Sequence, residues 1–389
     1  MKWIVINDTI VGGAYRAAKN YSIIISNNYN SSGKLIDLYF FNFGHKESIF
    51  RNIASRIINR IIKTLITPKA KRYFTFSRLK NRIPLATVRS DIEEIVNIHW
   101  LGNNIVDLSY LSTLDNKIIV TMHDMWFLTG GCHLPETCNQ YHNNCSNCPE
   151  SSTIGHWRIK KEYVRKRQFL LQENVEIIVP SLWLKANVEA TLGKECKLIR
   201  NPFVPVDVPE KDASRRSLDI RKDSTVIMMS AVGIDLDTNK ARDLHTLIEK
   251  IMTTLTDNNI EFIIIGAKRE LRIRNCTVYP ITYKEQDMAN FFNAADIFLM
   301  TSEIENLPYS IIEACYYGAF PIAYDVGGIK EIIDFAGFGK VVALHDVDQL
   351  INQINLYVNG KKKYHFSNVK DNIMKELGPD RFIRCIKDL

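Results

Sequence analysis

The sequence contains no long apolar run. No segment approaches the ~18 uninterrupted apolar residues of a membrane-spanning helix, so we expect no such helix. The amino terminus is apolar only from Trp3 to Ile6 before Asn7, which predicts that no signal peptide is present. Apolar residues make up 46% and charged residues 24%, a balance typical of a globular protein. At 389 residues the chain is too long for one ordinary core, which predicts two domains.

Acidic residues are absent from Arg51 to Arg89, a stretch that carries eleven basic residues. Apolar residues recur there at three- and four-residue intervals, from Ile49 to Ile66, and the first basic residues lie off that stripe. Within segment 49–89 this pattern predicts a basic amphipathic helix followed by an aromatic-basic segment that binds an anionic membrane surface. Two alternatives are a core-facing helix with a solvated basic face and a nucleic-acid site. No recognisable nucleic-acid module accompanies the charge, so we expect no nucleic-acid partner.

Cysteine is concentrated in one short segment, where Cys132, Cys138, Cys145 and Cys148 follow one another at intervals that include a metal-style pair. Four thiolates would complete a closed structural zinc site with no open position for catalysis. Free or redox-active thiols and disulfides are the alternatives.

Short β-branched runs alternate with helical stretches along the chain, which predicts parallel sheets with helices on both faces. The alternation breaks near Asn201-Pro202 and then restarts. We therefore predict an α/β protein of two doubly wound, Rossmann-like domains facing a central cleft. The domains are residues 1–203 and 204–369, with a C-terminal helix over 370–389 packing back on the first domain.

The strongest candidate site lies in residues 301–314. An apolar strand ends there, a polar loop carries Glu305, and Pro308 suits the first turn of a helix that carries Glu313. Backbone N–H groups of Asn306 and Leu307 would point at a phosphate, and carboxylates bind sugar hydroxyls. The alternative is a capped surface helix with incidental glutamates. A buried strand and a Gly-Gly turn follow at residues 320–328, and they offer a second close approach of backbone to ligand.

This stretch resembles the donor-binding half of the retaining glycosyltransferases of family four, which have the GT-B fold. Their hallmark is a Glu-x7-Glu pair followed by a Gly-Pro strand and a Gly-Gly turn. Gly12-Gly13 resembles the family's amino-terminal glycine loop, and residues 179–184 and 199–202 resemble the end of its first domain. Residues 98–100 and 121–133 resemble a narrower subgroup that builds colanic acid and O-antigen.

The resemblance implies roles for residues of the donor side. Glu305 would contact the transferred sugar near the reacting carbon, and Glu313 would hold the nucleotide ribose. Lys240 would neutralise the diphosphate leaving group, although Ala241 stands where the family has glycine. The family's partnering arginine is missing, and Arg242 is its candidate replacement. Residues Gly12, Gly13, Asn306, Leu307 and Gly328 complete the predicted donor site.

On the acceptor side, the family uses a histidine at the end of a strand to touch the donor sugar or the acceptor, and His123 stands at that place. The alternative is a structural histidine of the core. Further predicted acceptor-side residues are His99, Trp100, Asp124 and Trp126.

The function implied is a retaining glycosyltransferase that needs no cofactor for catalysis. It would move a sugar from a UDP- or GDP-sugar to a growing lipid-linked polysaccharide (O-antigen, capsule or exopolysaccharide), as a cytoplasmic protein peripheral on the inner face of the cell membrane. The alternatives are a sugar-nucleotide epimerase of the same fold and a zinc-stabilised binding module without activity. Paired carboxylates can also signal a hydrolase, but nothing else in the sequence supports one.

Overall fold

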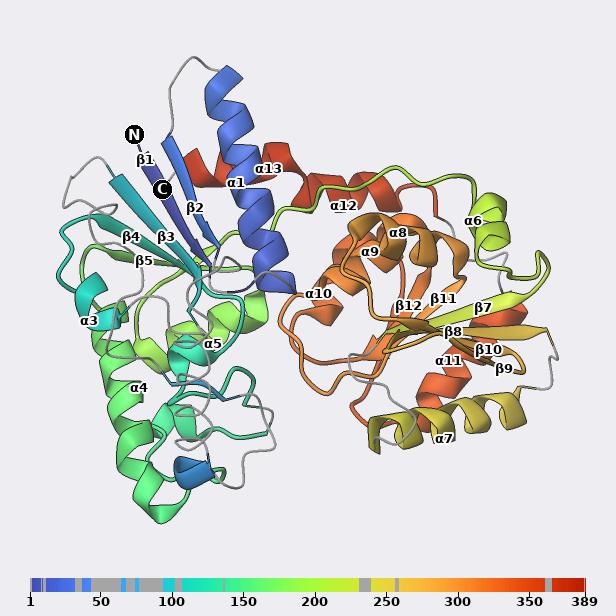
Figure 1. The fold of residues 1–389 in the computed structure, drawn as a ribbon, viewed down its shortest axis with the longest axis horizontal. Helices are drawn as coiled ribbons and strands as arrows, with labels where there is room; N and C mark the ends of the chain where they lie inside the picture. Colours follow the sequence, from blue (N-terminus) through green and yellow to red (C-terminus); the bar gives the residue numbers. More distant parts are fainter. Residues whose placement is uncertain are drawn as a thin grey trace. The chain divides into compact units, whose positions relative to one another are not determined.

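The chain divides into two units in a computed structural model (Figure 1). Unit 1 comprises Met1–Pro202 and Pro379–Leu389, and unit 2 comprises Phe203–Gly378. The structure describes every residue except 1, 8, 10, 11, 32–36, 43–63, 68–73, 77–93, 102–106, 136, 231–238, 256–258, 361–365 and 388. Only residues 64–66 of the predicted basic helix are described, and they are helical. The rest of that helix, and all of segment 49–89 except 64–67 and 74–76, lies outside the described residues.

Unit 1 is built on a parallel sheet in the order β2-β1-β3-β4-β5-β6. Its β-branched residues form continuous buried runs because helices cover both faces of such a sheet. The polar side chains of the unit are consequently found at the strand ends. The strands are β1 (Lys2–Asn7), β2 (Asp37–Asn42), β3 (Glu94–Trp100), β4 (Lys117–Thr121), β5 (Val175–Val179) and β6 (Lys197–Leu198).

Unit 2 is built on a second sheet in the order β13-β12-β11-β7-β8-β10-β9, parallel except for the antiparallel pair β9 and β10. That pair and β13 were not predicted, because each is short: β9 contains Arg272, β10 ends at Pro280, and β13 begins at Lys340 directly after a glycine. The strands are β7 (Thr225–Ser230), β8 (Ile260–Ala267), β9 (Leu271–Ile273), β10 (Cys276–Pro280), β11 (Ile297–Met300), β12 (Phe320–Tyr324) and β13 (Lys340–Val342).

Helices connect the strands in both units (Figure 1). None of the helices in the described part of the chain combines the length and hydropathy that a membrane span requires. In unit 1 they are α1 (Gly13–Ser31), α3 (Leu108–Leu111), α4 (His156–Leu170), α5 (Leu182–Leu192) and α13 (Pro379–Lys387). In unit 2 they are α6 (Lys211–Ser217), α7 (Asn239–Thr254), α8 (Glu285–Ala294), α9 (Tyr309–Tyr317), α10 (Ile329–Ala336), α11 (Val347–Gly360) and α12 (Val369–Leu377).

The segment predicted as one C-terminal helix over 370–389 is two helices. Helix α12 ends at Leu377 and packs on α9 and α10 of unit 2, whereas α13 begins at Pro379 and packs on α1 of unit 1. Proline suits the first position of a helix and disrupts an interior, so Pro379 separates the two. Within unit 1, Phe382 of α13 meets Tyr21 of α1 edge to face, with ring centroids 4.3 Å apart.

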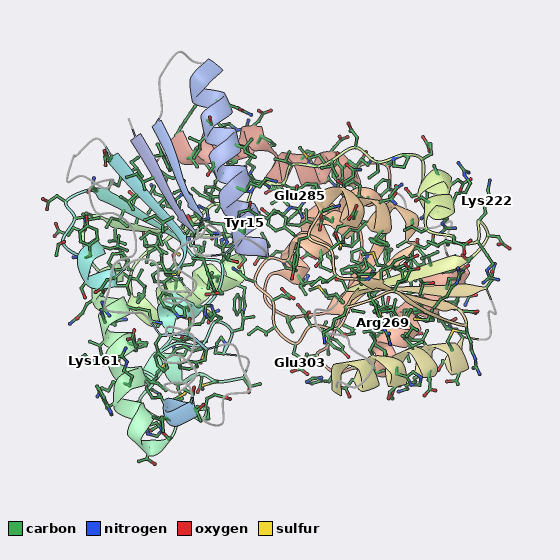
Figure 2. All side chains as sticks on the ribbon, in the orientation of Figure 1. Tyr15, Lys161, Lys222, Arg269, Glu285 and Glu303 are labelled. Atoms are coloured by element: carbon green, nitrogen blue, oxygen red, sulfur yellow. The ribbon has the colours of Figure 1, made fainter. Side chains whose placement is uncertain are left out.

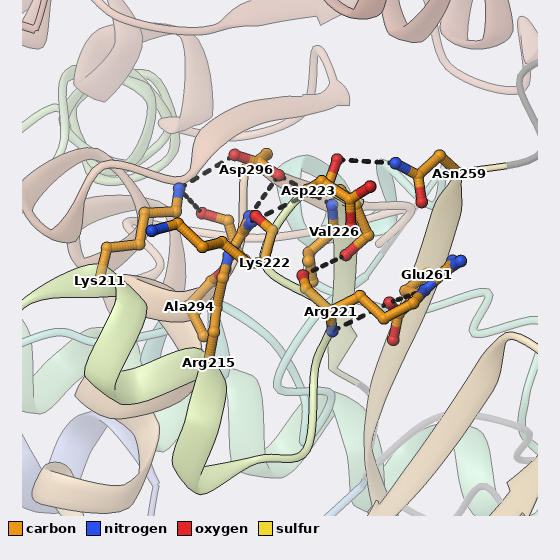
Figure 3. A network of polar contacts seen from close by, with 12 residues as sticks. Lys211, Arg215, Arg221, Lys222, Asp223, Val226, Asn259, Glu261, Ala294 and Asp296 are labelled. Atoms are coloured by element: carbon orange, nitrogen blue, oxygen red, sulfur yellow. Dashed lines mark hydrogen bonds and ion pairs between the residues drawn. The ribbon is translucent and has the colours of Figure 1, made fainter.

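A buried ionic network fixes the start of unit 2 (Figure 3). Asp296, just before β11, accepts hydrogen bonds from the Arg215 side chain at 2.6 Å, the Lys211 side chain at 3.0 Å and the Val226 backbone N–H at 2.9 Å. Arg215 also donates to the carbonyl oxygens of Ala294 and two residues of the turn before β7. One carboxylate thus joins α6 to the two central strands β7 and β11.

We expect Asp296→Asn to lower the free energy of unfolding by about 3 kcal/mol, because it leaves the buried Arg215 charge uncompensated. The matched control is Asp219→Asn, which breaks the exposed ion pair with Arg272 and should cost less than about 1 kcal/mol. Urea unfolding of both variants measures the difference. Equal costs would show that the Asp296 network does not stabilise unit 2.

Candidate active site

The carboxyl ends of β7, β11 and β12 gather the predicted donor residues of unit 2. Strand β7 pairs with β8 on one side and with β11 on the other, so the chain changes direction across the sheet between β7 and β11. Ligands of doubly wound sheets bind at such a switch point. Helices α9 and α10 follow the adjacent strands β11 and β12, and α7 follows β7, so three helix N-termini lie at this edge of the sheet.

The loop that carries Glu305 and the Gly-Gly turn are in direct backbone contact. The Gly328 N–H donates to the Asn306 carbonyl oxygen at 2.7 Å. Gly327 has a φ of +58°, and a Cβ at this position would lie 1.7 Å from the Glu305 carbonyl oxygen. Only glycine fits this approach without displacing backbone. The two motifs, separated in sequence by a helix and a strand, therefore form one platform.

Desolvation dominates the electrostatics of Glu305. Burial raises its pKa to about 7 from the usual 4.5, and a hydrogen bond from Ser302 only partly offsets the effect. A neutral carboxyl group and a carboxylate are therefore both present near neutral pH. Such a group is typical of a functional site, because its protonation responds to a nearby ligand.

The second predicted carboxylate, Glu313, is buried on α9. Pro308 is the N-cap of α9, which begins at Tyr309, so the predicted helix starts one residue later than expected. Asn306 and Leu307 precede the cap, and both side chains are buried. Asn306 and Leu307 thus belong to the loop that joins the Gly-Gly turn in the platform, and Glu313 lies on the helix that follows them.

Lys240 and Arg242 lie in the first turn of α7. Their side chains are outside the part of the chain that the structure describes, so their predicted contact with a diphosphate stays a prediction.

Unit 1 has a switch point of its own, between β1 and β3. Gly12 and Gly13 lie after β1, at the start of α1, and Gly12 is exposed with open space around its Cα. His99 and Trp100 end β3, and His123 follows β4. The carboxyl edge of this sheet therefore collects most of the predicted acceptor-side residues.

His99 and His123 form a neutral pair. The His99 Nδ1 and His123 Nε2 atoms are 2.8 Å apart, and the stacked rings have centroids 5.1 Å apart. Burial, with the neighbouring His123, holds the pKa of His99 well below its usual value. Burial lowers the pKa of His123 to about 4, although Asp124 partly opposes this. At neutral pH one proton lies between the two nitrogens, which fixes the orientation of the His123 ring.

Asp124 anchors a second polar network that includes two residues not predicted for the site. His133 Nδ1 lies 2.7 Å from Asp124 Oδ2, and His133 Nε2 lies 2.8 Å from the Thr75 hydroxyl. The Trp100 indole donates to Asp124 at 3.2 Å. Burial raises the pKa of Asp124, but the charge and hydrogen bonds of its partners outweigh burial and hold it below the usual range.

The predicted acceptor-side residue Trp126 is buried and held from two sides. Its indole N–H donates to the Thr75 carbonyl oxygen at 3.0 Å, and the Lys166 ammonium lies 3.9 Å from the ring centroid. Lys166 also donates to the Trp126 carbonyl oxygen at 2.6 Å. Burial lowers the pKa of Lys166 to about 8, against nearby negative groups that raise it. Trp126 thus belongs to the support beneath the polar network.

The four clustered cysteines line one small cavity. Cys132 and Cys148 share a hydrogen bond, and the Gly130 N–H donates to the Cys145 Sγ atom at 3.2 Å. All eight cysteines of the chain are free thiols in this structure. Within the described residues, no set of three or more His, Cys, Asp and Glu side chains is arranged to hold a metal ion. Structural zinc at Cys138 and its neighbours stays a prediction.

We expect Gly327→Ala to destabilise unit 2 by about 3 kcal/mol, because it combines left-handed backbone strain with a clash against the Glu305 backbone. Gly337→Ala is the control, since Gly337 has a φ of +68° and its nearest neighbour, the Asn372 side chain, is 4.0 Å from a built Cβ. It should cost about 1 kcal/mol. Urea unfolding measures the free energy of unfolding of both variants. Equal losses would contradict the close approach of Gly327 to the Glu305 backbone.

We also expect Glu305→Gln to become more stable relative to wild type as pH rises. Because the folded-state pKa is raised, the fold prefers the neutral carboxyl group and loses stability between about pH 4.5 and pH 7. Glutamine is neutral throughout and avoids that loss. Urea unfolding at pH 5 and pH 8.5 measures it, with exposed Glu303→Gln as the control. A pH-independent difference would contradict the burial of Glu305.

Comparison with known proteins gives independent information on both units. Residues 210–368 match the family described as Glycosyl transferases group 1. WcaC of Escherichia coli (strain K12), provisionally named a colanic acid biosynthesis glycosyl transferase, is 22% identical over 244 residues. That alignment covers 61% of this chain and 58% of the relative's length.

Solved structures match the chain over its full length. Sucrose-phosphate synthase from Thermosynechococcus elongatus has a TM-score of 0.67 at 11% identity, and the match covers 100% of this chain and 97% of that one. Anabaena HepE in complex with UDP-glucose has a TM-score of 0.59 at 12% identity, with coverage of 100% and 99%. Unit 2 thus matches the glycosyl transferases group 1 family over residues 210–368, and the chain has the α/β GT-B fold of two Rossmann-like units.

Proposed function

We propose that the chain is a retaining glycosyltransferase that moves a sugar from a UDP- or GDP-sugar to a growing, lipid-linked polysaccharide. The observation that carries the proposal is the platform of unit 2, where the Glu305 loop and the Gly-Gly turn are joined by backbone contact at a switch point. The match of residues 210–368 to the glycosyl transferases group 1 family supports it. HepE, of the same fold, was solved with UDP-glucose.

Helix N-termini at the carboxyl edge of the unit 2 sheet suit the chemistry of sugar transfer. Cleavage of the bond between the anomeric carbon and the diphosphate builds negative charge on the leaving oxygen and positive charge on the sugar. The dipoles of α7, α9 and α10, with Lys240, stabilise the leaving group without a metal ion. The Glu305 carboxylate stabilises the sugar, and buried Glu313 holds the ribose.

Retention of anomeric configuration follows if the acceptor hydroxyl attacks on the face that the diphosphate leaves. The new glycosidic bond forms as the old bond breaks, and the hydroxyl proton passes to the departing phosphate oxygen. No protein nucleophile is then required. In unit 1, neutral His123 presents an oriented ring for contact with sugar or acceptor hydroxyls, and His99 fixes that orientation.

The acceptor and location are proposed from the resemblance to WcaC and from the basic composition of segment 49–89. A polysaccharide destined for the cell surface and assembled on a lipid carrier would place the enzyme on the inner face of the cell membrane.

We expect Glu305→Ala to lower kcat/KM for sugar transfer by about 10²–10³ while the fold stays intact, because a charge-stabilising contact of the transition state is lost. Glu303→Ala, an exposed glutamate in the same loop (Figure 2), should change kcat/KM less than about twofold.

The measurement begins with a thermal-shift panel of sugar nucleotides to identify the donor, since a ligand at 100 times its Kd adds about 2.7 kcal/mol. Donor turnover is then compared between the two variants. Near-native turnover by Glu305→Ala would remove Glu305 from the site, and no thermal shift with any sugar nucleotide would contradict the donor assignment.

A further inference from the structure

Helix α4 carries an exposed face that the proposed site does not use. Its buried face consists of Ile159, Tyr163, Lys166, Phe169 and Leu170, all packed into unit 1. The opposite side exposes residues that recur at helical spacing and continue just past the helix end. These are Trp157, Lys160, Lys161, Val164, Gln168 and Leu171.

The exposed side is apolar as well as basic. Trp157 is 61% exposed, Val164 37% and Leu171 43%, although burial would stabilise side chains of this kind in a protein interior. The large indole of Trp157 is suited to the boundary between an apolar layer and water. Apolar side chains held in water on one helix side indicate a partner that offers an apolar layer.

The charge of α4 is strongly positive. The helix contains six basic residues and a single acidic residue, Glu162, which is buried and pairs with Arg158 at 2.9 Å. Arg165 pairs with Asp107. Lys160 and Lys161 point away from the buried face, and no acidic side chain of the described chain pairs with either (Figure 2 labels Lys161).

A further exposed apolar side chain, that of Leu65, lies beside the start of α4. Residues 64–66 form a short helical turn that is held by the segment preceding α4. The Ser152 N–H donates to the Ile66 carbonyl oxygen at 2.9 Å, and the Ser152 hydroxyl donates to the Leu65 carbonyl oxygen at 2.8 Å. The Leu65 side chain is 67% exposed. In sequence, this turn directly follows the basic residues up to Lys63.

We propose that these residues form a docking surface for an anionic lipid bilayer. The surface, here the α4 face, consists of Leu65, Trp157, Lys160, Lys161, Val164 and Leu171. The lysines would lie at the level of the anionic headgroups, and the apolar side chains would enter the headgroup–acyl boundary. A nucleic acid would engage the lysines but would leave the aliphatic side chains in water, so charge and apolarity together favour a bilayer.

This inference rests on the proposed function, because it gives the membrane contact of a lipid-linked acceptor a place in the described structure. None of the residues of the α4 face is among those named at either switch point. Donor binding and membrane binding can therefore be measured, and can fail, independently.

The test is co-sedimentation of the full chain with phosphatidylethanolamine vesicles with and without phosphatidylglycerol. Each lysine near an anionic surface contributes roughly a fivefold gain in partitioning. We expect Lys160→Glu/Lys161→Glu to lower binding to anionic vesicles by about 25-fold or more. Trp157→Ala should lower it about tenfold through lost apolar contact. Binding of the wild type should fall as salt screens the charges.

The matched control is Tyr283→Ala/Lys284→Glu, which removes an exposed aromatic side chain and an exposed lysine from unit 2. It should bind anionic vesicles within about twofold of wild type. Thermal unfolding and the nucleotide-induced thermal shift should be unchanged in all these variants, because the altered side chains are exposed and distant in sequence from the donor platform.

Three results would overturn the proposal. The first is wild-type binding that is equal for neutral and anionic vesicles. The second is binding of Lys160→Glu/Lys161→Glu to anionic vesicles that equals that of wild type. The third is found by measuring DNA binding as well: that variant would lose binding to DNA but keep binding to vesicles. Vesicle binding that depends on the α4 face, without any nucleotide-induced shift, would support the docking surface and contradict the proposed donor site.

Discussion

Helices cover both faces of a parallel sheet, so the side chains of its strands are buried on both sides. This constraint restricts polar functional groups to the ends of the strands. The central strands of both units are buried, whereas β9 and β10 at one edge of unit 2 are partly exposed, so the candidate residues follow the ends of the buried strands. Each sheet reverses its direction of growth once, between β1 and β3 and between β7 and β11. At each of these switch points the loops that follow the two neighbouring strands run to opposite faces of the sheet, which leaves room for a ligand between them. The locations of Glu305 and His123 follow from topology before any side-chain chemistry is considered.

Neutral or nearly neutral groups dominate both candidate sites. Burial keeps His99 and His123 uncharged and brings the pKa of Glu305 to about 7, so neither site holds a strong fixed charge among these side chains. Helix N-termini supply positive potential at the unit 2 edge, and the proposed function adds Lys240 to them. In that proposal the positive charge that attracts the diphosphate is shared between backbone dipoles and one lysine.

The positions of most strands along the chain and the helix that carries Glu313 could be predicted from sequence, because β-branched runs and a proline before a helix are local signals. The contact between Gly327 and the Glu305 backbone could not be predicted from sequence, because it depends on β11 and β12 being neighbours in the sheet. His133 lies close in sequence to the cysteines, yet it bonds to Asp124 and Thr75 instead. Helix α4 was not predicted because Lys166 interrupts its apolar stripe. The Trp126 ring and carbonyl oxygen, with nearby acidic groups such as Glu162, explain why a lysine is buried there.

The division of the C-terminal segment at Pro379 has a consequence for the order in which the chain can fold. Helix α13 packs on α1, and the Lys117 side chain contacts the Leu389 backbone, so unit 1 uses residues from both sides of unit 2 in the sequence. During synthesis, residues 379–389 emerge after all of unit 2. Unit 1 therefore cannot complete its core until the residues of unit 2 have been synthesised, and the surface of α1 around Tyr21 stays exposed until α13 has been made.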